Sequence, residues 1–397
     1  MIAGKKILFI TPRFLYPPND GAKIVFFSTF KYFCEKNEVD VISNISKQDT
    51  RYIPYIQNKV SRLSTIVFDV KVQHFLLLFH SLLFWKPYLL LKYLRPVFTK
   101  KIDEFLSTKE YDMVWIESSY MSFFIPHIRE KYPQIKIYLR SHNVESLLLQ
   151  RVYDETKNPF KRFLLKREII FMEKQETLMM QQADKVFVIS PIDEQTFLSI
   201  DPTLSNKLSL LYPTVDFEKY KKSSLPTEKN IVFIGSMDYL PNAHGIQWFV
   251  EKVFPEVEKI YPDVHLYIVW KWMPASFNKW TSRKNIILDR GVKEDVYYYD
   301  MARLFICPLF SWSGIKIKII NAFACEKAVL STSIWVEGLK VSNNQELFIQ
   351  DTPEWWVKVI SEVLWKDEEL NRVAHKWCMY AESNCNPQKV FPLLNIT

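Results

Sequence analysis

The chain has 397 residues, with 52 Lys and Arg against 44 Asp and Glu, and 48% of its residues are hydrophobic. This hydrophobic share excludes intrinsic disorder and a coiled coil, and the length indicates two domains. The five cysteines are odd in number and lack paired CxxC spacing, which argues against a disulfide scaffold or a structural zinc site. No window of about 18 uninterrupted apolar residues predicts a membrane-spanning helix.

The excess positive charge lies in the first half of the chain. Residues 1–200 contain 29 Lys and Arg and 21 Asp and Glu, a difference of +8, whereas residues 201–397 contain 23 of each kind. We therefore expect an anionic partner on the N-terminal side, such as a phosphate, a phospholipid or a nucleic acid. No nucleic-acid-binding motif is present, which disfavours the last of these.

Short apolar runs alternate with helical stretches, of which residues 161–183 are the longest. Such runs predict parallel strands covered on both faces. In the first half they are residues 6–10, 39–43, 66–70, 113–117, 135–139 and 185–190. In the second half they are residues 230–235, 264–269, 285–288, 304–308, 328–332 and 346–349. The pattern pauses at residues 210–217, so we expect one α/β domain over 1–210 and a second over 211–380.

Ligands of open α/β sheets bind at the carboxyl ends of the strands, so the turns from strand to helix are the candidate sites. Free amides at a helix start, helped by a lysine one turn later, suit a phosphate, and a histidine can act as acid, base or donor. Four such turns carry these residue types: Gly21; His142; Gly235, Ser236 and the expected helix cap Asn242; and Ser313, Gly314, Lys316 and Lys318. The alternative interpretation is that these glycines only form turns and that the lysines are solvated side chains on the surface.

Several other sites are disfavoured by missing motifs. The seven histidines show no HxH or HExxH spacing, and there is no DxD pair of carboxylates for a nucleotide-bound cation. No GxGxxG, P-loop or GxSxG sequence is present. We therefore expect neither a metal site nor a nicotinamide dinucleotide.

The four turns, in this order, resemble those of the GT-B glycosyltransferases, and among these the retaining family 4. The segments that carry the resemblance are residues 5–10 with 17–21, 141–146, 183–190, 231–242, 313–324, 329–332 and 336–339. They span nearly the whole chain. The resemblance implies an α/β fold of two Rossmann-like doubly wound domains facing across a cleft. The first would lie on the acceptor side, the second would bind the donor, and residues 381–397 would return to the first.

The resemblance also implies a role for each candidate residue. The donor would be a UDP- or GDP-sugar used without metal or cofactor, and a hexosyl or N-acetylhexosaminyl group would be transferred with retention. His142 would hydrogen-bond the transferred sugar, and Asn321 stands where the family usually has its second glutamate. The expected donor-binding residues are Gly21, Gly235, Ser236, Asn242, Ser313, Gly314, Ile315, Lys316, Lys318 and Glu337.

The sequence departs from the family pattern at several positions, including residues 326–328, which replace Gly-Lys-Pro. Trp312 replaces a glycine, Met237 a basic residue and Asn321 a glutamate. Two alternatives therefore stay open. One is a catalytically eroded GT-B protein that acts as a non-enzymatic partner in a glycosylation complex, and the other is a nucleotide-sugar epimerase with the same architecture.

One segment of the first half bears on the kind of acceptor. It is the apolar and aromatic run from His74 to Leu94, which is followed by Arg95, Lys100 and Lys101. This pattern predicts either a buried pair of helices or docking on an anionic membrane. Together with the basic first half, it favours a glycan or lipid-linked acceptor. We expect a bacterial enzyme of surface polysaccharide or lipopolysaccharide synthesis, cytoplasmic or peripheral on the inner face of the membrane.

Overall fold

The computed structural model describes residues 3–68, 77, 79–84, 87–237, 239–270, 275–292, 294–310, 316–336, 339, 343, 347–394 and 396. The chain divides into two compact units, Met1–Tyr212 with Val390–Thr397, and Pro213–Lys389. The first boundary lies two residues from the expected one at 210. The expected returning segment, 381–397, is divided between the units, and only Val390–Thr397 joins the first.

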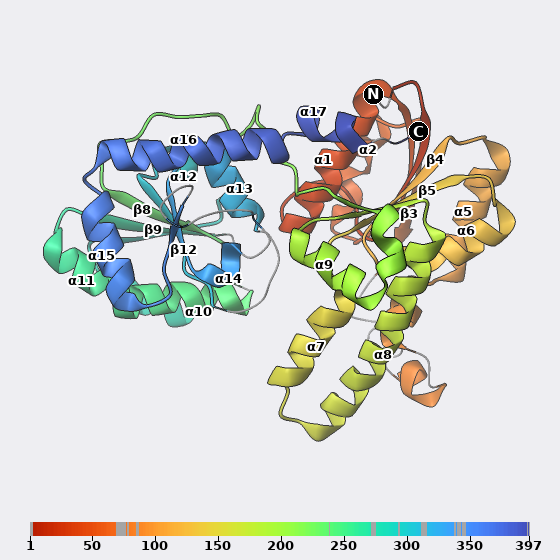
Figure 1. Ribbon diagram of the computed structural model, residues 1–397, viewed down its shortest axis with the longest axis horizontal. Helices are drawn as coiled ribbons and strands as arrows, with labels where there is room; N and C mark the ends of the chain where they lie inside the picture. Colours follow the sequence, from red (N-terminus) through yellow and green to blue (C-terminus); the bar gives the residue numbers. More distant parts are fainter. Residues whose placement is uncertain are drawn as a thin grey trace. The chain divides into compact units, whose positions relative to one another are not determined.

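The first unit is built on a seven-stranded sheet in the order β3-β2-β1-β4-β5-β6-β7 (Figure 1). Every neighbouring pair of strands is parallel. The strands are β1 (Lys6–Thr11), β2 (Glu38–Ile45), β3 (Arg62–Val67), β4 (Met113–Glu117), β5 (Lys136–Ser141), β6 (Lys185–Val188) and β7 (Leu208–Leu210).

Two edge strands differ from the prediction. The run at residues 66–70 was placed too late, because β3 lies at the sheet edge and begins with the half-exposed, partly polar stretch from Arg62 to Thr65. The sequence pattern also missed β7, which has three residues and no distinct apolar run. The helix predicted at residues 161–183 is α8 (Pro159–Gln182).

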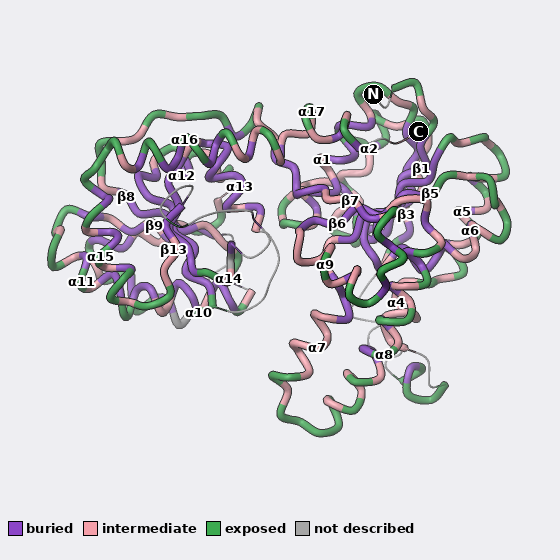
Figure 2. The backbone as a smooth tube through the Cα atoms, in the orientation of Figure 1, coloured by how far each residue is buried: buried purple, intermediate pink, exposed green. Residues whose placement is uncertain are grey.

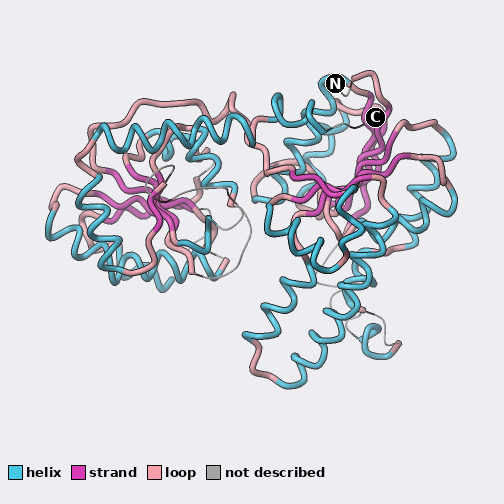
Figure 3. Tube along the Cα trace, in the orientation of Figure 1, coloured by secondary structure: helices cyan, strands magenta, loops and turns pink. Residues whose placement is uncertain are grey.

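Helices cover both faces of this sheet (Figure 3). The helices are α1 (Gly21–Lys36), α2 (Ile53–Gln57), α4 (Tyr88–Tyr93), α5 (Pro96–Thr108), α6 (Ile125–Lys131), α7 (Glu145–Glu155), α8 and α9 (Pro191–Ile200), with 3-10 turns at Asp49–Tyr52, Ser122–Phe124 and Pro202–Asn206. Side-chain caps fix the starts of α1, α8 and α9: Asp20, Asn158 and Ser190 each accept a backbone N–H three residues later.

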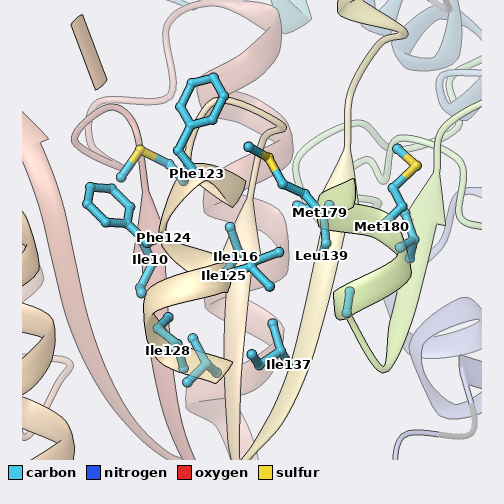
Figure 4. Close-up of a cluster of buried hydrophobic side chains, with 14 of the residues drawn as sticks. Ile10, Ile116, Phe123, Phe124, Ile125, Ile128, Ile137, Leu139, Met179 and Met180 are labelled. Atoms are coloured by element: carbon cyan, nitrogen blue, oxygen red, sulfur yellow. The ribbon is translucent and has the colours of Figure 1, made fainter. Parts of the chain in front are cut away.

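Successive strand residues enter two different cores, because side chains alternate across a strand. In β4, Val114 and Ile116 join one core, whereas Met113 and Trp115 join the other. Figure 4 shows part of the first core, in which Ile116 lies among side chains from β1, β5, α6 and α8. Both faces of these strands are therefore lined mainly by apolar side chains, and the strands lie in the buried interior of the unit (Figure 2).

The end of the chain completes the second of these cores. After α17 (Pro387–Val390), the 3-10 turn Phe391–Leu394 packs on the first unit. The Phe391 ring stacks on Tyr32 with a centroid distance of 4.5 Å, and Lys185 Nζ donates to the Leu394 carbonyl at 2.8 Å.

The second unit contains a six-stranded parallel sheet in the order β10-β9-β8-β11-β12-β13. The strands are β8 (Asn230–Ile234), β9 (His265–Trp270), β10 (Ile286–Arg290), β11 (Leu304–Cys307), β12 (Val329–Ser331) and β13 (Phe348–Ile349). The helices are α10 (Leu240–Trp248), α11 (Phe254–Ile260), α12 (Val296–Asp300), α13 (Ile317–Ala324), α14 (Ser333–Val336), α15 (Pro353–Val363) and α16 (Asp367–Asn384), with a π turn at Phe249–Val253 and a 3-10 turn at Ala275–Trp280. Both units are α/β, as predicted.

The strand order of each sheet identifies where a ligand can bind. β1 lies between β2 and β4, and β8 lies between β9 and β11, so the direction of winding reverses beside the first strand of each sheet. Loops that follow strands on the two sides of such a reversal leave the sheet toward opposite faces, which opens a crevice at the carboxyl ends. The turns after β1, β4, β8 and β11 are therefore the places to examine.

Candidate functional site

The carboxyl ends of β4 and β5 bring together a histidine and a glutamate in the first unit. The predicted site residue His142 directly follows β5, and its Nε2 lies 2.7 Å from Glu117 Oε2 at the end of β4. The Glu117 side chain is fully buried, and the His142 side chain is 12% exposed. Trp115 Nε1 donates to the other Glu117 oxygen at 3.0 Å, and Phe26 packs edge-on against the imidazole. The imidazole is thus held in one orientation.

A buried arginine lies beside this pair. Arg140, the fifth residue of β5, is fully buried and donates to Thr29 Oγ1 at 2.7 Å and to the Tyr212 carbonyl at 3.0 Å. Its positive charge partly compensates the buried charge of Glu117. A buried carboxylate needs such compensation, because desolvation strongly disfavours its charged form.

The charge state of the pair follows from these contacts. Burial raises the pKa of Glu117, but His142, Arg140 and Trp115 outweigh burial and bring the net pKa below its usual value. Burial lowers the pKa of His142, and the neighbouring Glu117 only partly offsets this effect. At neutral pH we therefore assign an ionised Glu117 and a neutral His142 that donates its Nε2–H. Nδ1 is then the hydrogen-bond acceptor of the ring.

Two further buried carboxyl groups, Glu145 and Glu176, lie at the start of α7, which follows β5. Glu145, the first residue of α7, accepts a hydrogen bond from the Tyr120 hydroxyl. Glu176 of α8 accepts from the backbone N–H groups of Glu145 and Ser146, so it caps α7 from a neighbouring helix. Burial raises the pKa of each carboxyl group to about 7. These two groups can hold or release protons near neutral pH.

The predicted turn after β1 contains an acidic cap. Gly21 is the exposed first residue of α1, and Asp20 precedes it as the N-cap. Asp20 accepts from the Lys23 N–H at 3.1 Å and pairs with Arg13 at 2.6 Å. A phosphate bound at the start of α1 would therefore lie beside the negatively charged Asp20 carboxylate.

In the second unit, the turn after β8 is tied to α13. Lys318 Nζ donates to Asn242 Oδ1 at 2.9 Å, and Asn242 Nδ2 donates to the Ser236 carbonyl at 2.7 Å. Gly235 makes room for this contact, because a Cβ atom there would lie 2.9 Å from the Asn242 amide. The predicted role of Asn242 as a helix cap is wrong. The N-cap of α10 is Tyr239, and Asn242 uses its amide to join the turn to Lys318.

The two predicted lysines both lie in apolar surroundings. The Lys318 ammonium is 4.3 Å from the centre of the Phe233 ring, and the Lys316 ammonium is 5.3 Å from that of Tyr239. Burial, followed by the charge of Lys318, lowers the pKa of Lys316 to about 8. Burial also lowers the pKa of Lys318. Both shifts show that this place stabilises positive charge poorly without an anion.

Asn321 lies one turn after Lys318 on the same side of α13. It is 2% exposed, and its Oδ1 has no hydrogen-bond partner among the described residues. Its side chain interacts with the buried Tyr299 hydroxyl, which donates to the Lys318 carbonyl at 3.2 Å. Asn321 therefore faces the interior of the second unit and adjoins the backbone that carries Lys318.

The other predicted residues are not all available for comparison. Ser313, Gly314, Ile315 and Glu337 lie outside the described residues. Among the residues that are described, no group of three or more His, Cys, Asp or Glu side chains could hold a metal ion. None of the helices described combines the length and apolar composition needed to cross a bilayer.

Glu117 was missed at the sequence level, although a signal for it was present. It is the only charged residue in the run Met113–Glu117, and it ends that run. A carboxylate that ends a buried parallel strand lies at the edge of the sheet where ligands bind. Its pairing with His142 depends on β4 and β5 being neighbours, which the sequence pattern alone did not establish.

Comparisons with known proteins agree with this architecture. Residues 228–365 match the family described as glycosyl transferases group 1. The chain is 24% identical over 299 residues to an "uncharacterized 44.6 kDa protein in cps region" from Klebsiella pneumoniae, with 73% of this chain and 75% of that protein covered.

Solved structures share the fold across both units. Sucrose-phosphate synthase from Thermosynechococcus elongatus superposes with a TM-score of 0.70 at 13% identity and covers 97% of this chain and 96% of its own. HepE from Anabaena, in complex with UDP, has a TM-score of 0.67 at 11% identity, with 98% of both chains covered. HepE with UDP-glucose matches similarly, with a TM-score of 0.66 at 10% identity and the same coverage. The expected GT-B glycosyltransferase resemblance is confirmed, whereas the retaining family 4 assignment stays a prediction.

The Glu117–His142 pair predicts a measurable change in the titration of His142. Replacing Glu117 by Gln removes the negative charge that favours the imidazolium, so the pKa of His142 is expected to fall further below its usual value. The imidazole resonances of the variant can be followed by NMR over a pH series. The matched control is Glu110→Gln, an exposed residue of the same unit, which should leave the His142 titration unchanged. An unchanged or raised His142 pKa in Glu117→Gln would contradict the assigned ionisation of the pair.

Proposed function

We propose that this GT-B glycosyltransferase moves a hexosyl or N-acetylhexosaminyl group from a UDP- or GDP-sugar to a glycan or lipid-linked acceptor. We propose further that it works with retention and without metal, at the cytoplasmic face of a bacterial membrane, in surface polysaccharide synthesis. The observation that carries the proposal is the half-buried pair Lys316 and Lys318, which lies in the stretch that matches glycosyl transferases group 1.

The relatives support the substrate class. HepE, which shares the fold, was solved with UDP and with UDP-glucose, and the Klebsiella relative is named for a cps region. These names fit a nucleotide sugar as donor and a surface polysaccharide as product. The basic first half of the chain fits an acceptor that carries phosphate or lies at an anionic surface.

The lysines supply what the leaving group needs. Breaking the bond between a sugar and a nucleoside diphosphate develops negative charge on the diphosphate, and fixed positive charge in a poorly hydrated place stabilises it. Lys318 is held at the turn after β8 by Asn242, and Lys316 lies two residues before it. Two half-buried cations can take over the charge neutralisation that a metal ion performs in other transferases.

His142 has a separate task in the proposal. Its neutral ring, fixed by Glu117, offers Nδ1 as an acceptor for a sugar hydroxyl. A fixed acceptor orients the sugar and favours the geometry of transfer, without the histidine serving as a general base. Asn321, which is buried beside Tyr299, would act on the donor through the position of α13.

Binding of the donor gives the first test of the proposal. Replacing Lys318 by Met keeps most of the side-chain volume and removes the charge, so affinity for UDP or GDP should fall by about tenfold to hundredfold. Calorimetry and thermal shift with both nucleotides and their sugars measure this loss, since a ligand of the folded state raises apparent stability. The matched control is Lys327→Met, because Lys327 is a buried lysine of the same unit that donates to the Ser224 and Asp300 carbonyls.

Absence of binding and hydrolysis with every common nucleotide sugar would remove the proposal. Equal loss of affinity in Lys327→Met would show that the effect of Lys318→Met is one of stability. A product formed from the donor alone and identified as its epimer would indicate an epimerase.

The pKa of Lys316 gives the second test. With a pKa of about 8, Lys316 loses its charge as the pH rises above that value. UDP affinity should therefore fall between pH 7 and pH 9.5, about fivefold to tenfold. Calorimetry with Lys316→Arg should show a flatter profile, because a guanidinium keeps its charge throughout this range. The unliganded protein should change in the opposite sense: the unfolded chain holds the Lys316 proton to higher pH, so this group adds stability as pH rises above 8. A parallel fall in affinity in wild type and Lys316→Arg would reject the role of this lysine.

The third test concerns His142. Replacing it by Ala removes the sugar-orienting acceptor, and transfer to the acceptor should fall by at least about a hundredfold. Circular dichroism and UDP affinity should be unchanged, because the donor contacts proposed above come from the second unit. His127→Gln, a partly exposed histidine of α6, is the matched control and should retain activity. Full activity of His142→Ala would reject the role.

A further inference from the structure

The hairpin formed by α7 and α8 exposes phenylalanines far from any core. Phe160 and Phe163, in the first turns of α8, are 60% and 54% exposed. No residue between 156 and 167 is buried, whereas Ile169 and Met172 in the continuation of the same helix lie in the core. Figure 1 shows the connected ends of the two helices projecting from the sheet, and Figure 2 shows that their tip is largely exposed. More than half of each of these two side chains is therefore in contact with solvent.

A second exposed apolar segment lies against the same helix. Arg167 of α8 donates to the Ser81 carbonyl at 3.2 Å, which places residues 79–84 beside the hairpin. Phe79, Leu83 and Phe84 in this segment are 60%, 63% and 57% exposed. Residues 79–84 belong to the apolar run from His74 to Leu94, which the sequence offered either as a buried helix pair or as a membrane-docking surface. In α4, later in the same run, Leu89, Leu90 and Tyr93 pack against the core, so only residues 79–84 are considered for docking.

The charge around these rings is mainly positive, although the exposed Asp154 and Glu155 end α7 just before them. Residues 156–167 contain only basic charged residues, namely Lys157, Lys161, Arg162, Lys166 and Arg167. Lys157, Lys161 and Lys166 are exposed, and none of them forms an ion pair with any residue that the structure describes. Their charges remain available to an external anion.

The tip is ordered by its own hydrogen bonds. Asn158 Oδ1 accepts from the Lys161 N–H at 3.0 Å and so caps α8. Arg162 donates to the Tyr153 carbonyl at 3.0 Å and to that of Thr156 at 3.2 Å, which closes the connection between the helices. The exposed rings are thus presented on a preformed surface, which lowers the ordering cost of docking.

We propose that residues 156–167 and 79–84 form a docking surface for a lipid membrane with anionic headgroups. The aromatic rings would enter the boundary between headgroups and acyl chains, and the lysines would meet the lipid phosphates. A lipid surface fits better than a protein partner, because lysine is depleted at the cores of protein interfaces, whereas lysine beside aromatic residues suits a membrane interface. The inference rests on the proposed function, since it supplies the means by which the enzyme reaches a lipid-linked acceptor.

Vesicle co-sedimentation of the full chain tests this surface. Binding to vesicles of phosphatidylcholine with phosphatidylglycerol should exceed binding to phosphatidylcholine alone and should weaken with salt. Phe160→Ser with Phe163→Ser, and separately Lys157→Gln with Lys161→Gln and Lys166→Gln, should each lower the partition coefficient by at least about tenfold. The matched control is Ile260→Ser with Lys259→Gln, an exposed apolar and basic pair on α11 of the second unit, which should bind as wild type.

Three outcomes would overturn the docking surface: no vesicle binding by the wild-type chain, equal binding by the phenylalanine variant, or loss of a stable homodimer in that variant without an effect on vesicles. UDP binding and donor hydrolysis in detergent-free solution should be unchanged in both hairpin variants. This readout separates the two proposals. A chain that binds vesicles through the hairpin but never binds a nucleotide sugar would keep the docking surface and lose the proposed transferase activity.

Discussion

The structure depends first on the covering of two parallel sheets on both faces. Because successive residues of a strand such as β4 enter cores on opposite sides, a polar side chain within the strand would be buried without solvent. Polar groups therefore gather where the strands end. Glu117 and His142 at the ends of β4 and β5, and Asn242 after β8, lie at such ends, beside the reversal of strand order in each sheet.

In the first unit, neighbouring groups stabilise the charge of the buried Glu117 carboxylate. An ionised carboxylate with no exposure would be unstable alone, and the contacts of Glu117 show how it is retained. Arg140 contributes compensating charge, and its two terminal amino groups donate to Thr29 and to the Tyr212 carbonyl. Arg140, which binds the chain that follows β7, thus also helps His142 and Trp115 to keep Glu117 ionised. This coupling explains why a neutral histidine can coexist with a buried carboxylate at the same strand ends.

The α/β class and most strands were accessible from the sequence, because buried parallel strands are nearly continuous apolar runs. The edge strands β3 and β7 were less accessible, since one is partly polar and the other has three residues. The residues of the candidate site likewise differ in how far the sequence could predict them. Lys318 could be identified from its place after a strand, whereas the pairing of Glu117 with His142 requires the neighbourhood of β4 and β5. The misassigned Asn242 shows the limit of local reasoning: an asparagine near a helix start is usually a cap, but a lysine 76 residues later engages its side chain instead.

In the second unit, by contrast, the candidate site contains two lysines. Lys316 and Lys318 lie close to each other in apolar surroundings, and in both cases burial is the main cause of the lowered pKa. Lys318 has an amide oxygen and an aromatic ring as partners, which satisfy its donors in part but bring no negative charge. Burial that lowers the pKa of a lysine costs stability while the lysine is charged, and an anionic ligand bound beside it would restore that stability. The same lysines that destabilise the empty unit would therefore provide both donor affinity and stabilisation of the departing diphosphate.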